Sequence, residues 1–387
     1  MKKKNLRSKE WFDNPKDPGL TALYLERYLN YGLKKKDLQS GKPIIGIAQS
    51  GSDLSPCNRH FLSLSKTIKD GIRIAGGVPM EFPTHPIQET GKRPTAALDR
   101  NLSYLSLVEV LYGYPIDGVI LTTGCDKTTP AALMAAATVN IPSIVLSGGP
   151  MLDGTYKGKK AGSGTIIWEA RKLHAKGEID YDEFMDMAAA SAPSVGHCNT
   201  MGTASSMNSI AEALGMSLTG GAIIPAPYKE RENISFETGK RIVDMVHEDL
   251  TPSKIMTKKA FENATYVASA IGASSNCPPH LTAIAKHMGI DFGIENWEKL
   301  GHDIPLLVNC QPAGEHLMEG FFKAGGIPVI MQELLKNNKL HKNVMTVTGK
   351  TIEENLKNIN NNNEDVIKSF NNPIVSNAGF IVMKSNF

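Results

Sequence analysis

The feature of this sequence that most constrains its fold is an alternation between short apolar, β-rich runs and longer segments with helical periodicity. Between the first two runs, residues 58–77 carry apolar side chains at helical spacing before a Gly-Gly pair. This alternation predicts an α/β fold with a mostly parallel sheet and helices on both faces. The β-rich runs are residues 42–49, 116–123, 142–149, 264–272 and 304–309.

Three parts are expected along the chain. Residues 1–41 are polar and aromatic and form an N-terminal arm with a helix around residues 21–33. Residues 42–370 form the α/β domain that carries the site, either as one unit or as two α/β subdomains. Residues 371–387 end on an apolar, strand-like run, so we expect them to begin a further domain that is truncated here.

Charge and hydropathy exclude several classes of partner. Lys and Arg number 42 against 39 Asp and Glu, and a net charge of +3 over 387 residues lacks the basic field that nucleic acids require. No apolar run reaches the roughly 20 residues of a membrane helix. The basic start is not followed by the apolar stretch of a signal peptide. We therefore expect a cytoplasmic protein with reduced cysteines and no membrane or nucleic-acid partner.

Three of the five cysteines share one kind of position. Cys57 and Cys125 follow the predicted strands 42–49 and 116–123, and each of them, like Cys198, precedes a helical pattern. Strand-to-helix turns gather at the carboxyl edge of an open α/β sheet. The amino end of a helix also lowers the pKa of a thiol. These three thiols are therefore expected to converge as metal ligands.

The residues alone leave an alternative open. A single cysteine is most often a small buried apolar residue, and we expect this of Cys277 and Cys310, which have no charged neighbours. For the other three, a metal or iron–sulfur site and separate buried thiols both remain open. Zinc fits less well, because their separations of 68 and 73 residues contain no close pair of the C-x2-C type.

Charged residues accompany one of these thiols. Asp126 and Lys127 directly follow Cys125, and Glu89 lies on a loop after an apolar stretch. Carboxylates at a sheet edge are candidate Mg²⁺ ligands, although Glu89 alone also fits a solvated surface residue. Lys127 suits such a site if its amine is neutral or carbamylated.

Two further features are less specific. The glycine-rich segment 146–164 lacks the phosphate-binding patterns G-x-x-x-x-G-K-[ST] and G-x-G-x-x-G in register, so a loop that covers the substrate is the alternative to phosphate binding. His197 is expected to be a structural histidine rather than a ligand.

Two long motifs carry a family resemblance. "GCDKTTPAALMAAATVNIPSIVLSGGPM" (124–151) resembles a signature of the dihydroxy-acid dehydratase and phosphogluconate dehydratase family, and "GHCNTMGTASSMNSIAEALGMSL" (196–218) resembles its second signature. Segments 88–119 and 311–335 are more similar to the sugar-acid branch, the arabinonate and xylonate dehydratases. The resemblance covers nearly the whole chain.

The resemblance implies two cofactors. A [2Fe–2S] cluster would bind Cys57, Cys125 and Cys198, and three protein ligands would leave one iron able to act as a Lewis acid. Mg²⁺ would bind Glu89, Asp126 and Lys127, the lysine as a carbamate. Asp126 and Lys127 would thereby also take part in catalysis.

The implied reaction is dehydration of a sugar acid such as arabinonate or xylonate. Mg²⁺ would chelate the carboxylate and the C2 hydroxyl, iron would take the C3 hydroxyl, and the enol would tautomerise to a 2-keto-3-deoxy acid. Family members are typically homo-oligomers, so we expect a dimer or tetramer.

The same resemblance leaves the activity of this chain open. Family members place the base serine and a further magnesium ligand in a β-barrel-like C-terminal domain, which we expect to be absent here or supplied by a separate polypeptide. The alternative is an inactive, cluster-binding oligomer scaffold. A zinc hydrolase is the third reading and fits least.

Overall fold

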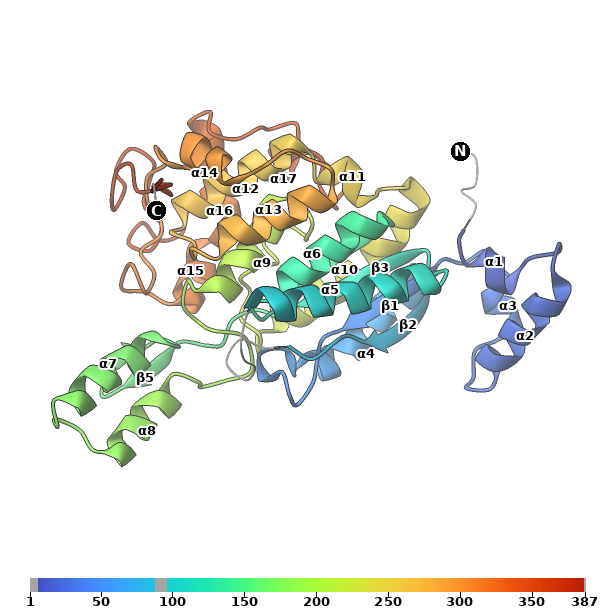
Figure 1. Cartoon of the computed structure of the whole chain (residues 1–387), viewed down its shortest axis with the longest axis horizontal. Coiled ribbons are helices and arrows are strands. Elements are labelled where there is room, and N and C mark those ends of the chain that lie inside the picture. The colour runs from blue at the N-terminus through green and yellow to red at the C-terminus, as the bar shows by residue number, and fades with distance from the viewer. Residues whose placement is uncertain (1–5, 88–95, 386–387) are drawn as a thin grey trace.

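A four-stranded parallel sheet lies at the centre of the computed structural model, which describes residues 6–87 and 96–385 (Figure 1). The strand order is β2-β1-β3-β4, and Ile45 of β1 pairs with Pro79 on one side and Gly118 on the other. Strands β1, β3 and β4 are buried throughout because helices cover both faces. The predicted α/β class and three of the predicted strands are confirmed. The strands are β1 (Ile44–Gln49), β2 (Val78–Pro83), β3 (Gly118–Thr123) and β4 (Ser143–Ser147).

Two helices pack on each face of the sheet. Helices α4 and α10 cover one face, and α5 and α6 cover the other. Helices α4 and α10 cross closely at Gly71 and Gly239, where an added Cβ would collide with the backbone carbonyls of Phe236 and Ile68. Glycine at both positions allows this close approach. The bounds are α4 (Phe61–Ile74), α5 (Ala96–Gly113), α6 (Thr128–Val139) and α10 (Lys229–Glu248).

Helix α6 is enclosed on all sides. Residues 128–137 are buried without exception, since the sheet lies on one side and helices α5, α9 and α13 pack on the others. A helix that is apolar around its whole circumference requires such a position. This explains the many small side chains in "TTPAALMAAATV". The other helices of the body are α9 (Thr203–Ala213), α11 (Pro252–Ile255), α12 (Lys258–Ala270), α13 (Cys277–His287), α14 (Ile294–Gly301), α15 (Met318–Ala324), α16 (Gly326–Lys336) and α17 (Ile352–Asn355).

Two predicted strands are wrong. Residues 264–270 belong to α12 and residues 271–272 to the turn after it, because Ala260, Phe261, Ala264 and Val267 form a buried stripe at helical spacing that begins before the predicted run. Residues 304–309 are extended but join no sheet. They pair only through isolated bridges, such as the one from Leu306 to residue 375. A short apolar run alone does not distinguish a buried helix from a strand.

The structure contains a strand that sequence analysis did not predict. Strand β2 lies at the sheet edge, and its prolines, Pro79 and Pro83, alternate with the residues that bond β1. The amides of Val78 and Thr84 donate inward to β1 or its flank, so the prolines occupy positions on the free outer side. Proline is tolerated there and protects the edge from pairing with another strand.

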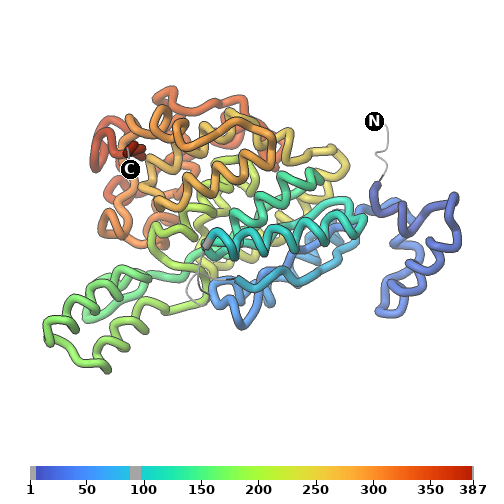
Figure 2. The backbone as a smooth tube through the Cα atoms, in the orientation of Figure 1, coloured from blue at the N-terminus to red at the C-terminus, as the bar shows by residue number. Residues whose placement is uncertain are grey.

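Two smaller parts project from opposite ends of the body (Figure 2). The N-terminal arm holds α1 (Lys9–Phe12), α2 (Pro18–Leu29) and α3 (Lys35–Leu38), and Trp11 stacks on Tyr24 with ring centroids 3.9 Å apart. A lobe holds the hairpin β5 (Gly154–Tyr156) and β6 (Lys159–Ala161) with α7 (Thr165–Ala175) and α8 (Tyr181–Ala190), around its own small apolar core. The second half of segment 146–164 is thus a hairpin rather than a loop. In the described part of the chain, every helix is too short or too polar to cross a membrane.

Candidate metal and substrate site

The three expected thiols come from three separate turns. Cys57 lies in a short 3-10 helix (Pro56–Asn58) after β1, Cys125 lies between β3 and α6, and Cys198 precedes α9. Cys125 is buried, whereas Cys57 and Cys198 are half-buried.

These turns bring the thiols together. The pKa of the Cys57 thiol is raised, first by a hydrogen bond with Cys125, then by burial and by the negative charges of Cys125, Cys198 and Asp126. Four acidic groups this close cannot all ionise without a compensating cation. The three thiols, which are 68 and 73 residues apart in the sequence, therefore lie close together at the carboxyl edge of the sheet.

Asn58 ties two of the turns to each other. Its Oδ1 atom accepts a hydrogen bond from the backbone N–H of Cys125 at 3.0 Å, and both residues are buried. Gly124 lies against this bond, because an added Cβ would collide with Asn58 Oδ1. The Cys57 turn and the Cys125 turn are thereby held at a fixed distance.

Asn208 of α9 supports the same turn from the other side. Its Nδ2 atom donates to the carbonyl of Gly124 at 3.1 Å, and its Oδ1 atom accepts from the hydroxyls of Thr123 and Thr129. Thr128 closes the start of α6, since its hydroxyl donates to the carbonyl of Cys125 at 2.9 Å. The helix that follows Cys198 thus holds the turn that carries Cys125.

Asp126 and Lys127 are buried beside the thiols, with 4% and 5% of their surfaces exposed. Lys127 Nζ lies 3.7 Å from Asp126 Oδ2. Burying two charged side chains lowers the stability of the fold unless each is paired, so such residues are often retained for a function. Glu89, the third expected magnesium ligand, lies outside the described residues.

Helix α13 adds residues that sequence analysis did not assign to the site. Cys277 is buried, as expected, and burial raises its pKa, but it also lies within reach of the Asp126 charge. Burial, together with the charges of Arg100 and Lys127, lowers the pKa of His280 to about 4. The two prolines after Cys277 are typical of a helix start, and this was the sequence signal that could have placed Cys277 at the beginning of a helix.

Arg100 and His280 form a buried contact between α5 and α13. Arg100 Nη1 donates to His280 Nδ1 at 3.0 Å, so the proton of the neutral ring resides on Nε2. Burial lowers the pKa of Arg100. Among the described residues, no ion pair joins Arg100 to a carboxylate.

The donor set fits an iron–sulfur cluster. Thiolates are the usual ligands of such clusters, and Ser55 Oγ and Asn58 Nδ2 are buried beside Cys57 without a partner in the described part of the chain. Donors of this kind suit anionic sulfur. No group of three His, Cys, Asp or Glu side chains within residues 6–87 and 96–385 has the arrangement for a single ion.

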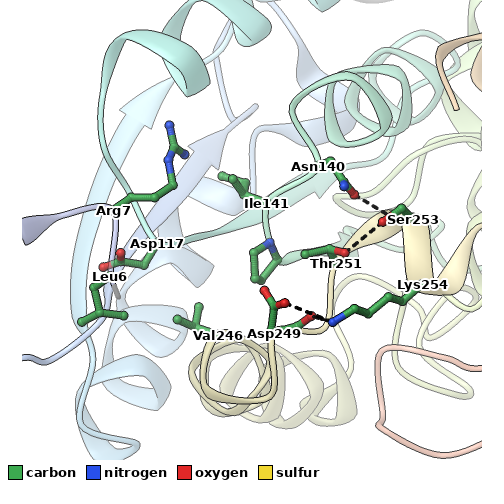
Figure 3. A pocket seen from close by; sticks show the side chains of 11 residues that line it. Leu6, Arg7, Asp117, Asn140, Ile141, Val246, Asp249, Thr251, Ser253 and Lys254 are labelled. Carbon is green, nitrogen blue, oxygen red and sulfur yellow. Dashed lines mark hydrogen bonds and ion pairs between the residues drawn. The ribbon is translucent and has the colours of Figure 1, made fainter. Parts of the chain in front are cut away.

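A cavity of about 450 Å³ lies at the opposite, amino edge of the sheet (Figure 3). Lys254 Nζ lies 3.1 Å from Asp249 Oδ2, and Asn140 Oδ1 accepts from the backbone N–H of Ser253 at 2.9 Å. Asp117 accepts from the amide of Ile44 at 2.7 Å. These polar groups bond one another or the backbone. The cavity therefore lies at the junction of the arm and the sheet, and its lining holds no thiols, unlike the site at the opposite edge.

Comparison with known proteins gives a consistent result. The family model described as dihydroxy-acid/6-phosphogluconate dehydratase N-terminal matches residues 42–355. The chain is 58% identical over 383 residues to a D-xylonate dehydratase of Caulobacter vibrioides, covering 99% of this chain and 64% of that protein. It is 44% identical to an L-arabinonate dehydratase of Rhizobium leguminosarum, covering 100% of this chain and 67% of that protein.

A more distant relative extends the comparison. The chain is 36% identical over 356 residues to a dihydroxy-acid dehydratase of Acetivibrio thermocellus, covering 90% of this chain and 64% of that protein. The chain thus spans about two thirds of the length of the curated relatives it matches.

Proposed function

This chain belongs to the dihydroxy-acid/6-phosphogluconate dehydratase family, and from that premise we propose that it dehydrates a sugar acid of the aldonate class. The most similar of the relatives described above are named for D-xylonate and L-arabinonate, which supports a five-carbon substrate. Loss of the C2 hydrogen and the C3 hydroxyl yields water and an enol, which tautomerises to a 2-keto-3-deoxy acid.

One observation carries the proposal. Cys57, Cys125 and Cys198 meet at the carboxyl edge of the sheet beside the buried Asp126 and Lys127. Ligands of open α/β sheets bind at this edge. Three thiols and the carboxylate of Asp126 are costly to bring together without a metal to bind, because each negative charge opposes the ionisation of the others. Burying the ionic pair of Asp126 and Lys127 adds a desolvation cost.

The chain's residues take distinct roles in this proposal. When bound, a [2Fe–2S] cluster and Mg²⁺ supply Lewis acidity to the leaving hydroxyl and to the carboxylate end of the substrate. Cys57, Cys125 and Cys198 hold the cluster as thiolates. Cys125 is buried and the other two thiols are half-buried, and this partial shielding from water strengthens the electrostatic interactions within the site.

Asp126 and Lys127 hold Mg²⁺ together with Glu89 in this proposal. A carboxylate is an ordinary magnesium ligand, whereas an ammonium group repels the ion. Carbamylation resolves this conflict, since the neutral amine of Lys127 adds to CO₂, releases a proton and becomes an anionic oxygen ligand. The charge of Lys127 is close enough to His280 to help lower the pKa of its ring.

Anaerobic reconstitution with iron and sulfide tests the assignment. We expect Cys125→Ser to abolish the brown chromophore and the bound iron. The matched control is Cys310→Ser, because Cys310 is also buried but its thiol lies near the carbonyl of Leu317 and the charges of Asp153 and Lys160. Equal loss of iron in both variants would contradict the assignment of the thiols.

Activity is tested on the reconstituted protein with D-xylonate and L-arabinonate. The expected product is a keto acid, detected by its reaction with semicarbazide. A chromophore without product from either acid would favour a cluster-binding scaffold over an enzyme.

A further inference from the structure

The turn after β4 contains two glycines that admit no side chain. A Cβ on Gly148 would lie 2.7 Å from Nε2 of His60. Gly149 has a φ of +82°, and its Cβ would collide with the carbonyl of Ile224 and lie 2.6 Å from Nη2 of Arg231. Glycine is required at both positions because the His60 ring at one, and the Ile224 carbonyl and the Arg231 side chain at the other, leave no space for a Cβ.

This turn joins two of the thiol turns. His60, three residues after Cys57, bonds through Nε2 to the carbonyl of Gly148 at 2.9 Å. His197, next to Cys198, donates its backbone N–H to the carbonyl of Gly149 at 3.0 Å. The Cys57 and Cys198 turns are therefore both fastened to the same pair of glycines.

Arg231 fixes the turn from α10. It is fully buried, and its Nη1 atom donates to the carbonyls of Ser147 and Gly221 at 2.6 and 2.9 Å. Its Nη2 atom donates to the carbonyl of Ile224. Its Nε atom lies 3.0 Å from the position of a Cβ on Gly149, so it faces the same turn.

The carbonyl contacts determine the tautomers of both histidines. Nε2 of His60 meets a carbonyl, which only accepts, so Nε2 carries the proton and Nδ1 is an acceptor. Nδ1 of His197 lies 3.0 Å from the carbonyl of Cys198, so Nδ1 carries the proton and Nε2 is an acceptor.

Three complementary atoms are left around the turn. His60 Nδ1 and His197 Nε2 are acceptors, and Arg231 Nε–H is a donor. Each is buried without a partner among the described residues. Buried polar atoms are almost always bonded, to protein or to ordered water. A direct bond between the two histidine atoms is impossible, since both are acceptors.

We infer that these three nitrogens bind one ordered water molecule, which donates to His60 and His197 and accepts from Arg231. A buried water typically makes about three hydrogen bonds, so the set matches its capacity. A second part of the inference concerns the cluster and rests on the proposed function. His60, His197 and Arg231 are positioning residues that hold the Cys57 and Cys198 turns at the spacing that the cluster requires.

The water is tested in crystals of the metal-free protein at about 1.8 Å resolution or better. We expect a density peak within about 3.2 Å of all three nitrogens. The variant His197→Asn keeps a donor to the Cys198 carbonyl but lacks the acceptor, so the peak should weaken or vanish. An unoccupied space between the nitrogens in the wild type would overturn the inference.

The positioning role is tested by cluster retention and by spectroscopy. We expect His197→Asn and His60→Gln to lose iron to a chelator about 10-fold faster, as other partners of metal ligands do when they are removed. Their visible circular dichroism should also shift. The control is His287→Gln, a histidine bonded to Thr138 on the far end of α6, which should match the wild type.

The two proposals fail in different ways. Wild-type protein that takes up no cluster would refute the proposed function and, with it, the positioning role, whereas the water is still judged from metal-free crystals. Unchanged iron loss and spectra in both histidine variants would refute the positioning role while the cluster stands.

Discussion

The bond between Asn58 and the Cys125 amide can be broken from either side. Asn58→Ala removes the acceptor and leaves a buried N–H without a partner. Gly124→Ala adds a Cβ that collides with Asn58 Oδ1 and forces it away, and Gly124 has no positive φ that would add backbone strain. Both variants therefore remove the same hydrogen bond.

The expected magnitudes follow from this shared cause. A buried donor left unsatisfied costs about 1–3 kcal/mol, so the free energy of unfolding of each single variant should fall by roughly that amount. In the double variant, the alanine that replaces Asn58 has no Oδ1 atom for the new Cβ to displace. Its loss should equal that of Asn58→Ala alone, which gives a coupling energy of about 1–3 kcal/mol.

Thermal unfolding of the metal-free protein measures these losses. With an unfolding entropy of about 2.1 cal/mol/K per residue, 387 residues give about 0.8 kcal/mol per degree, so 2 kcal/mol lowers Tm by about 2–3 °C. The four proteins of the cycle are compared at one pH, with far-UV circular dichroism as a check of folding. A double variant whose Tm falls by the sum of the two single losses would refute the reasoning.

Three other predictions rest on buried groups. Burial raises the pKa of Glu212 to about 7 from about 4.5. The protonated carboxyl therefore contributes about 3 kcal/mol to the stability of the fold below pH ~4.5, and this contribution is lost as the pH rises to ~7. Glu212→Gln should flatten the fall of Tm over this range, and an unchanged slope would contradict the shift. Arg100→Met removes the donor to His280 Nδ1, so the ring should no longer be held in the Nε2-protonated tautomer. In ¹⁵N NMR the two ring nitrogens should then show a mixture of both tautomers, and an unchanged pattern would contradict the contact. Gly71→Ala should cost about 1–3 kcal/mol, because its Cβ meets the Phe236 carbonyl, and a Tm equal to the wild type would show that the helices can separate freely.

The accuracy of sequence analysis differed between elements for physical reasons. Strands β1, β3 and β4 were predictable because buried parallel strands are continuous apolar runs. Residues 264–272 were misassigned because the helical stripe of α12 begins at Ala260, outside the short run. Strand β2 was missed because its two prolines oppose a strand assignment, and only its position at the sheet edge permits them.

The site shows the same division. The turns of Cys57 and Cys125 follow from strand ends, helix starts and Pro130, all of which are local signals, and the assignment of these thiols as ligands remains a prediction. Arg100 and His280 are 180 residues apart, so no local pattern links them. Cys277 was recognised as buried, but its position beside Asp126 depends on how α13 packs against α6.

The sequence by itself determined the parallel sheet and the helix-start positions of the cysteines, because periodicity and turn residues act over a few neighbouring positions. Only the tertiary structure decided which side chains face those cysteines. The reason for Gly148 and Gly149 appears only in the folded chain, where His60, Arg231 and the carbonyl of Ile224, from distant segments of the sequence, contact the same turn.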